Sequence, residues 1–250
     1  MAAIRVGIGG WVFAPWRGVF YPEGLAQARE LHYASRALTS IEINGTFYGA
    51  QKPASFRKWH AETPPDFVFA VKGTRYATHR RDLRESRASV ERFFGTGVLE
   101  LGEKLGPILW QFPATTRFDA ANFAAFLEIL PQEIERRRIR HVLEVQHPSF
   151  KTEEFTALLR AHKVAAALVD SEKHPLIEEM TADFVYARLR RTVPNEATGY
   201  SPRALDGWAE RFRRCAGGAD GRDCFVYFIS GAKERAPAAA QALIERVGTP

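Results

Sequence analysis

The sequence alternates short apolar segments with helical segments, and this repetition limits the fold more than any other feature. Strands are predicted at 4–11, 40–44, 67–72, 107–112, 141–146, 164–169, 184–189 and 224–229. Helices are predicted between them at 25–37, 54–62, 85–105, 118–130, 151–162, 202–215 and 237–247, whereas the segment after the sixth strand is short or irregular. Such alternation indicates parallel strands joined by right-handed crossovers. Eight units in 250 residues match a closed TIM-type (β/α)8 barrel, expected as one domain over residues 1–250.

An open, doubly wound sheet is the alternative architecture. Gly7 and Gly9 superficially match a dinucleotide-binding loop, but Val12 stands in the third glycine position. Pro15 and Trp16 then follow where such a loop would start a helix. The polar residues on nearly every predicted strand also favour the barrel, because helices bury both faces of an open sheet.

Polar side chains gather near the carboxyl ends of the predicted strands, where the sites of (β/α)8 barrels lie. Residues two apart on a strand point the same way, which gives three same-face pairs. The pairs are Glu42 with Asn44, Glu144 with Gln146, and Arg188 with Arg190. Since an unpaired buried charge costs about several kcal/mol, we expect these faces to line one shared pocket. The further members of the set are Lys72, Gln111, Asp170 and Ser230.

Such a set permits general acid–base chemistry. Cations keep a neighbouring carboxylate ionised, whereas an apolar wall keeps it protonated. We therefore assign catalytic roles to Glu42, Glu144, Asp170 and Lys72. Two alternatives stay open, namely Lys72 as a Schiff-base nucleophile and the whole set as an ion-pair network that closes the barrel.

Metal and phosphate sites are further alternatives. Glu42, Glu144, His147, Asp170 and His174 offer ligands for a divalent metal, but no HExxH pattern or tight His/Cys cluster appears, and we predict neither metal nor cofactor. An anion site is conceivable at Gly231 and Lys233 after the eighth strand, where barrels often bind phosphate.

A long aromatic loop follows the first predicted strand. Trp11, Phe13, Trp16, Phe20 and Tyr21 either plug the barrel mouth or stack on a ligand. Trp11 and Trp16 are therefore counted as substrate-binding candidates, together with the loop histidines His79 and His147.

The overall charge favours anionic partners. The net charge is +6, so a small anion or a nucleic acid is the expected class of ligand. A basic cluster on and after the third strand favours the nucleic-acid alternative, and it comprises Lys72, Arg75, Arg80, Arg81, Arg84 and Arg87. Two cysteines are too few for a disulfide scaffold. The start of the chain lacks a signal-peptide pattern and no apolar run is long enough to span a membrane, so we expect a cytoplasmic protein.

Several segments together resemble the YecE-like family, domain of unknown function 72, over nearly the whole chain. They are GGWVFAPWRGVFYPE, EINGTFYGAQKPASFRKWHAETPPDFVFAVKGTRYATH, LGPILWQFP, LEVQHPSF, FVYARL, GYSPRALDGWA and FVYFISGAKERAPAAAQAL. The resemblance implies a TIM-type barrel but no established reaction. Its motif positions add Tyr48 and Tyr200 to the substrate-binding candidates.

The sequence departs from the family pattern at the expected mouth. Gly9 replaces a serine, Gln146 an arginine, Arg190-Arg191 a His-Gly pair, and Ile229-Ser230 paired asparagines. These departures indicate a divergent member whose ligand differs from the typical one, with Arg188 or Arg190 restoring the charge absent at Gln146. We expect an enzyme or ligand-binding barrel for a small anionic or hydroxylated molecule, with a non-catalytic interaction protein as a further alternative.

Overall fold

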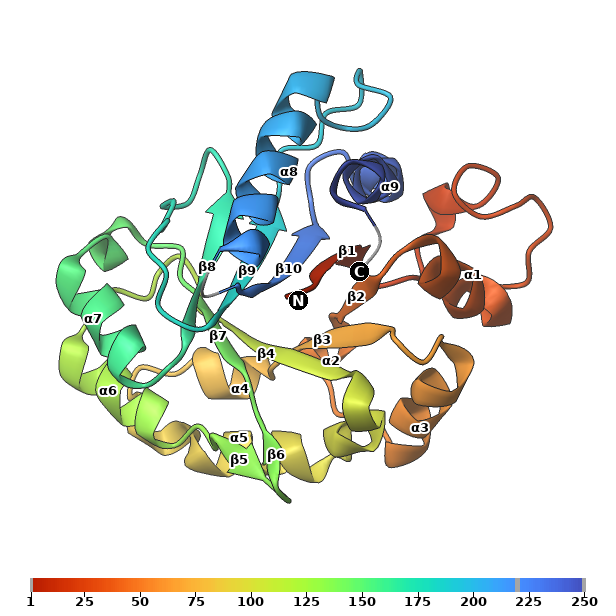
Figure 1. The fold of residues 1–250 in the computed structure, drawn as a ribbon. Coiled ribbons are helices and arrows are strands. Elements are labelled where there is room, and N and C mark those ends of the chain that lie inside the picture. The colour runs from red at the N-terminus through yellow and green to blue at the C-terminus, as the bar shows by residue number, and fades with distance from the viewer. Residues whose placement is uncertain (1, 219–220, 249–250) are drawn as a thin grey trace.

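The computed structural model describes residues 2–218 and 221–248 and forms a closed, all-parallel barrel surrounded by helices (Figure 1). The strands follow one another around the barrel in the order β1-β10-β9-β8-β7-β4-β3-β2. The pairing of β1 with both β2 and β10 closes the ring. The predicted TIM-type barrel is thus confirmed, and the open-sheet alternative is excluded.

Short strands build the barrel, and a small hairpin lies outside it. The barrel strands are β1 (Ile4–Gly9), β2 (Ser40–Ile43), β3 (Val68–Lys72), β4 (Leu105–Gln111), β7 (His141–Glu144), β8 (Ala165–Asp170), β9 (Phe184–Leu189) and β10 (Asp223–Phe228). In the hairpin, β5 (Glu133–Ile134) pairs with β6 (Arg137–Arg138) in antiparallel fashion. The hairpin was not predicted from the sequence.

Helices connect successive strands around the outside. The α-helices are α1 (Glu30–Ala37), α2 (Gly45–Tyr48), α3 (Pro53–Glu62), α4 (Arg75–Thr78), α5 (Arg87–Gly95), α6 (Ala120–Glu128), α7 (Glu153–Ala161), α8 (Pro202–Gly217) and α9 (Ala236–Val247). Short 3-10 segments lie at Ala14–Trp16, Gln27–Arg29, Leu83–Ser86, Val98–Lys104, Pro148–Phe150 and Lys233–Arg235. None of the helices described has the length and apolar character needed to cross a membrane.

Two helix predictions need correction. The helix predicted at 85–105 is split into a 3-10 turn, α5 and a second 3-10 segment, because Gly97 and Gly102 adopt φ values of 93° and 56° that interrupt a right-handed helix. The segment from 171 to 183, expected to hold a short or irregular sixth helix, contains no helix at all.

Strand alternation creates two apolar layers. Outward side chains pack against the helices in the larger layer, for example Ile41 and Ile43 on β2. Inward side chains such as Ala70, Leu109, Tyr186 and others fill the barrel in the second layer. Because one face of each strand points into the barrel, its last inward residues meet at the carboxyl end.

Glycine allows β1 to approach β2 closely. A Cβ atom built on Gly7 would lie 1.8 Å from the backbone oxygen of Ser40, so no larger residue fits there. The Ser40 hydroxyl also lies 2.7 Å from the Tyr227 hydroxyl across the barrel interior. These contacts fix β2 and therefore position Glu42, the next inward residue of that strand.

Candidate functional site

A buried ion-pair network occupies the carboxyl end of the barrel. Arg188 on β9 donates from Nη2 to Glu42 Oε1 at 3.0 Å and from Nε to Glu42 Oε2 at 3.1 Å. The same guanidinium donates from Nη1 to Glu144 Oε2 on β7. All three side chains are almost fully buried, and Tyr186 donates its hydroxyl to Glu42 Oε2 at 2.6 Å. One arginine therefore joins the two carboxylates predicted from distant parts of the sequence.

The second carboxylate also binds the rim of the barrel. Glu144 Oε1 accepts hydrogen bonds from Gln111 at 2.7 Å and Gln146 at 3.2 Å, and Arg190 Nη1 lies at 3.4 Å. Burial acts to raise the pKa of Glu144, but Arg188, Arg190 and the Gln111 hydrogen bond outweigh it and lower the pKa to about 2. Glu144 is therefore ionised at neutral pH and has every oxygen engaged.

Arg188 is fixed as a cation. Burial lowers the pKa of Arg188, but the negative charges of Glu144 and Glu42 raise it by more, so the net shift is upward. Each carboxylate oxygen of Glu42 and Glu144 accepts a hydrogen bond from a side chain of the network. The two glutamates are thus held in place at the bottom of the mouth.

Lys72, the last residue of β3, lies beside this network without joining it. Its Nζ sits 3.8 Å from the centre of the Phe47 ring, and no carboxylate of the described residues comes within 4.0 Å of it. Burial, followed by repulsion from Arg188, lowers the pKa of Lys72 to about 8, while Glu42 and Glu144 act in the opposite direction. Lys72 therefore loses its proton at a pH closer to neutral than an ordinary lysine does.

The strand–helix turn after β2 holds Lys72 and the rim in place. Thr46 donates its hydroxyl to the Lys72 carbonyl at 2.6 Å, which ties α2 to the end of β3. Phe47 packs edge-on against His79 and Tyr48, and Tyr48 remains exposed. Burial, Lys72 and Arg75 all lower the pKa of His79.

Asp170 and Tyr200, predicted as a catalytic and a substrate-binding residue, bond to each other outside the barrel interior. Inward residues of β8 are Ala165, Ala167 and Val169, so Asp170 projects toward the helical layer. There it accepts the Tyr200 hydroxyl at 2.7 Å and lies 3.7 Å from Arg191. This pair anchors the loop after β9, and we withdraw both residues from the site.

Both tryptophans of the aromatic loop also pack outside the mouth. Trp16 has no exposed surface, and its indole nitrogen donates to the Lys233 carbonyl at 3.0 Å. Trp11 packs edge-on against Trp59 of α3. Since neither ring reaches the network, we withdraw both as ligand-stacking residues. Lys233 Nζ lies 4.3 Å from the Phe13 ring centre, which places this cation on the aromatic loop.

The remaining candidates are rim residues with local partners. Asn44 Nδ2 donates to the Glu42 carbonyl at 3.3 Å and stays half-buried. His147 accepts the Ser149 backbone amide at Nδ1 and so caps the following 3-10 turn. Ser230 has a φ of 66°, and its carbonyl accepts the Thr192 hydroxyl. His147 and Ser230 therefore support loops at the rim.

Two further residues, Tyr186 and His174, were not predicted as site residues. Tyr186 lies two residues before Arg188, and extending the same alternation backward would have placed it on the same face. His174, considered only as a metal ligand, has a buried Nδ1 that finds no hydrogen-bond partner in the described part of the chain. Burial, and after it the positive charge of Arg190, lowers the pKa of His174. Nothing in the local sequence pattern predicts that this nitrogen is buried.

The acidic and histidine residues do not assemble a metal site. Within residues 2–218 and 221–248, no three side chains of His, Cys, Asp or Glu come together in a way that could hold a metal ion. The set Glu42, Glu144, His147, Asp170 and His174 is thus dispersed, because Asp170 faces outward and His147 caps a turn.

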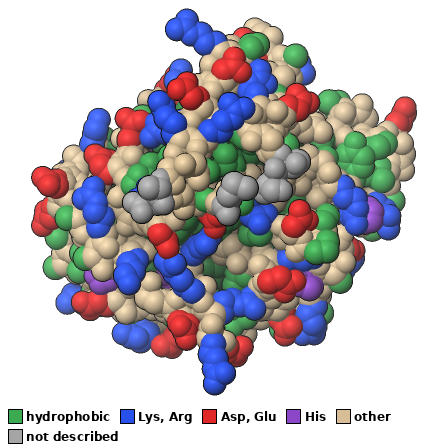
Figure 2. Space-filling view, in the orientation of Figure 1, with side chains coloured by type: hydrophobic (Ala, Val, Ile, Leu, Met, Phe, Trp, Pro, Cys, Tyr) green, Lys and Arg blue, Asp and Glu red, His purple; other side chains and the backbone are tan. Residues whose placement is uncertain are grey.

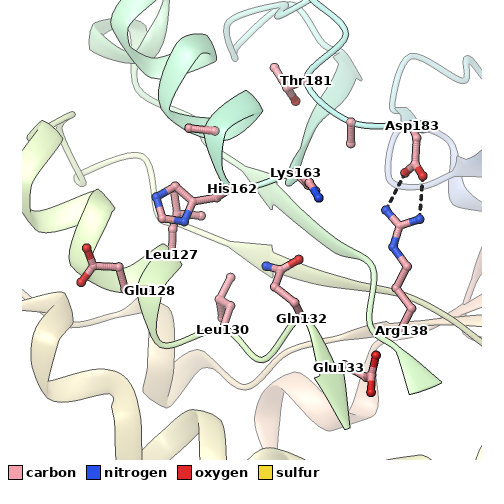
Figure 3. A pocket seen from close by; sticks show the side chains of 12 residues that line it. Leu127, Glu128, Leu130, Gln132, Glu133, Arg138, His162, Lys163, Thr181 and Asp183 are labelled. Atoms are coloured by element: carbon pink, nitrogen blue, oxygen red, sulfur yellow. Dashed lines mark hydrogen bonds and ion pairs between the residues drawn. The ribbon is translucent and has the colours of Figure 1, made fainter. Parts of the chain in front are cut away.

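A depression of about 880 Å³ lies elsewhere, near the amino ends of β7 and β9. Figure 3 shows Arg138 and Asp183 joined on one side of it and Glu128 and His162 on the other. It contains none of the predicted site residues. On the face in Figure 2, basic and acidic side chains alternate, which matches a solvated surface better than a continuous basic patch.

The closed barrel with charged residues at its strand carboxyl ends defines a TIM-barrel protein. The family described as "Protein of unknown function DUF72" matches residues 5–250, and the chain belongs to that family. Among curated proteins, the UPF0759 protein YunF of Bacillus subtilis (strain 168) is 30% identical over 116 residues, which are 44% of this chain. The match spans only 40% of YunF.

Solved structures agree with this assignment. A DUF72 family protein from Thermotoga maritima MSB8 is 25% identical with a TM-score of 0.76, covering 96% of both chains. A DUF72 family protein from Enterococcus faecalis V583 has a TM-score of 0.73 at 14% identity, covering 98% of this chain and 95% of its own. The second likeness shows the fold alone.

Proposed function

We propose that the barrel mouth binds a small anionic, hydroxylated molecule and that Lys72 exchanges a proton with it. The observation that carries the proposal is Lys72 itself, a buried lysine that has no carboxylate partner within residues 2–218 and 221–248 and has a pKa of about 8. A general acid–base group works best when its pKa is close to the working pH. Of the four residues expected to be catalytic, the proposal keeps Lys72 as the proton-transfer group and does not use Glu42, Glu144 or Asp170 for that step.

Charge in the mouth favours an anionic ligand. Three cations, Arg188, Arg190 and Lys72, face two carboxylates, Glu42 and Glu144. Arg188 is paired with both carboxylates, whereas Arg190 is half-buried and, among the residues described, contacts one carboxylate, at 3.4 Å. An anion placed between Arg190 and Lys72 balances the remaining positive charge.

Amide groups at the rim suit hydroxyl groups on the same ligand. Gln111, Gln146 and Asn44 are half-buried and each has hydrogen-bonding capacity left beyond its single bond in the structure. Their positions are set by Glu144 and the backbone of β2, so the polar rim is organised before a ligand arrives. Preorganised groups of this kind reduce the entropy lost on binding.

A calorimetric titration with a panel of phosphorylated sugars and hydroxycarboxylates at pH 7 tests the proposal. At least one member should bind the wild-type protein, and Lys72→Met and Arg190→Ala should each weaken that binding about tenfold or more. Arg138→Ala, at the amino ends of the strands, is the matched control and should leave binding unchanged. Binding that survives both mouth substitutions, or a panel without any ligand, would overturn the proposal.

The lowered pKa of Lys72 also favours a second candidate, a Schiff base with a carbonyl substrate. Incubating the protein with small aldehydes or ketones and cyanoborohydride should then modify Lys72, as read by peptide mass spectrometry. Labelling that is no greater than at the exposed Lys151 removes this candidate.

A further inference from the structure

A basic pocket lies beside the mouth, between the loops that follow β3 and β4. Its volume is about 520 Å³, and it is lined by His79, Arg80, Arg81, Pro113, Thr115, Thr116, Arg117 and Asn122. β3 ends at Lys72 and β4 ends at Gln111, so both loops leave strands that contribute to the mouth. The pocket therefore opens on the same end of the barrel as the proposed site.

The charge of this pocket is not balanced from within. Three arginines and no carboxylate line it. Arg81 and Arg117 form no ion pair within 4.0 Å with any carboxylate in the described part of the chain. Arg80 lies 3.5 Å from Glu85, a contact between partly exposed groups that contributes little.

Local hydrogen bonds hold both loops in place. Asn122, in the first turn of α6, donates to the Arg81 carbonyl at 2.9 Å and accepts the Leu83 amide at 2.8 Å. Arg80 Nε donates to the Tyr76 carbonyl at 2.8 Å. On the other side, the Thr116 amide donates to the Pro113 carbonyl at 3.0 Å. The pocket walls are thus formed without a ligand.

We propose that this pocket binds the phosphate group of a small phosphorylated hydroxycarboxylate, whose carboxylate at the other end is the anion placed between Arg190 and Lys72. Guanidinium groups and threonine hydroxyls are the donors that phosphate oxygens prefer, and arginine binds them in bidentate fashion. A volume near 520 Å³ exceeds one phosphate and falls in the usual range of small-molecule sites. His79 borders the pocket and packs against Phe47, whose ring centre lies 3.8 Å from Lys72 Nζ, so a continuous line of contacts joins the pocket to Lys72. The inference rests on the proposed function for the part of the ligand at Lys72.

The test compares each phosphorylated ligand with its dephosphorylated counterpart in calorimetric titrations at fixed ionic strength. The phosphorylated form should bind wild-type protein at least tenfold more tightly. The double variant Arg81→Ala/Arg117→Ala should lose that preference and keep the affinity for the dephosphorylated form. Arg87→Ala, an exposed arginine of α5 outside the pocket, should behave as wild type.

Inorganic phosphate and a short single-stranded oligonucleotide are the other two probes. Phosphate should bind wild type and Lys72→Met equally and the double variant at least tenfold more weakly. If the double variant keeps the preference for the phosphorylated ligand, the phosphate site is wrong, and the proposed role of Lys72 is not affected. Conversely, if Lys72→Met binds the ligand as tightly as wild type while phosphate binding is intact, only the proposed function is wrong. Tight oligonucleotide binding without phosphomonoester binding overturns the small-molecule assignment.

Discussion

The ammonium nitrogen of Lys72 lies 3.8 Å from the centre of the Phe47 ring, on the apolar side of a barrel end that is otherwise filled by ion pairs. The ring offers a weak cation–π attraction in place of a carboxylate. Both residues are buried, but Arg188 contacts two carboxylates whereas Lys72 contacts an aromatic ring. Lys72 is therefore the cation of the mouth that we propose meets the ligand.

Replacing Lys72 by methionine should stabilise the protein near pH 7. The pKa of Lys72 is about 8 in the folded protein against 10.5 for an ordinary lysine, so the charged form is disfavoured by folding. We expect a gain of about 3 kcal/mol in the free energy of unfolding, measured by urea denaturation.

The gain should depend on pH in one direction. Between pH 8 and 10.5 the unfolded chain binds more protons at this lysine than the folded one, so wild-type stability rises relative to Lys72→Met. The advantage of the variant therefore shrinks above pH 8. A pH-independent difference, or a similar gain from the exposed control Lys151→Met, contradicts this account of Lys72.

Arg188→Met should destabilise the protein strongly. The substitution leaves Glu42 and Glu144 buried without their shared cation, and breaking a buried pair in this way costs about 3–5 kcal/mol. Arg190→Met removes only the longer, partly exposed contact to Glu144 and should cost about 1 kcal/mol. Chemical denaturation at pH 7 measures both, and equal losses would show that Arg188 is not the centre of the network.

Glu144 should contribute to acid denaturation. Its pKa is about 2 in the folded protein against 4.5 for an ordinary glutamate, so its stabilising contribution is complete above pH 4.5 and is lost as the pH falls toward 2. That contribution is about 3 kcal/mol. The stability difference between wild type and Glu144→Gln should accordingly narrow below pH 4.5. The exposed Glu91→Gln serves as control and should follow wild type throughout.

Much of the fold follows from local pattern. Alternation of apolar strands and helices predicts the barrel, and period-two spacing predicts that Glu42, Glu144 and Arg188 face inward. The two-residue rule fails at Asp170, because the inward face of β8 falls on Val169 and no neighbouring polar residue marks the register. A shift of one residue reverses the face of a strand side chain.

Other features depend on contacts that the sequence does not encode locally. Trp16 and Trp11 are amphipathic enough to stack on a ligand or fill a core, and only the packing of their loop decides between these. The hairpin of β5 and β6 turns at Glu135 and Arg136, both with positive φ and neither a typical turn residue. Whether Lys72 forms an ion pair with Glu42 or Glu144 likewise depends on how far these residues lie from β3. No spacing along the chain reveals that distance.

The pKa of Lys72 tests the central claim most directly. Reductive ¹³C-methylation of the lysines, followed by NMR over pH 6–11, gives one titration for each side chain, and Lys72→Arg identifies the resonance of Lys72. We predict a pKa of about 8 that rises when a small anion from the binding panel is added. A Lys72 resonance that titrates near 10.5 and ignores every anion would contradict the account.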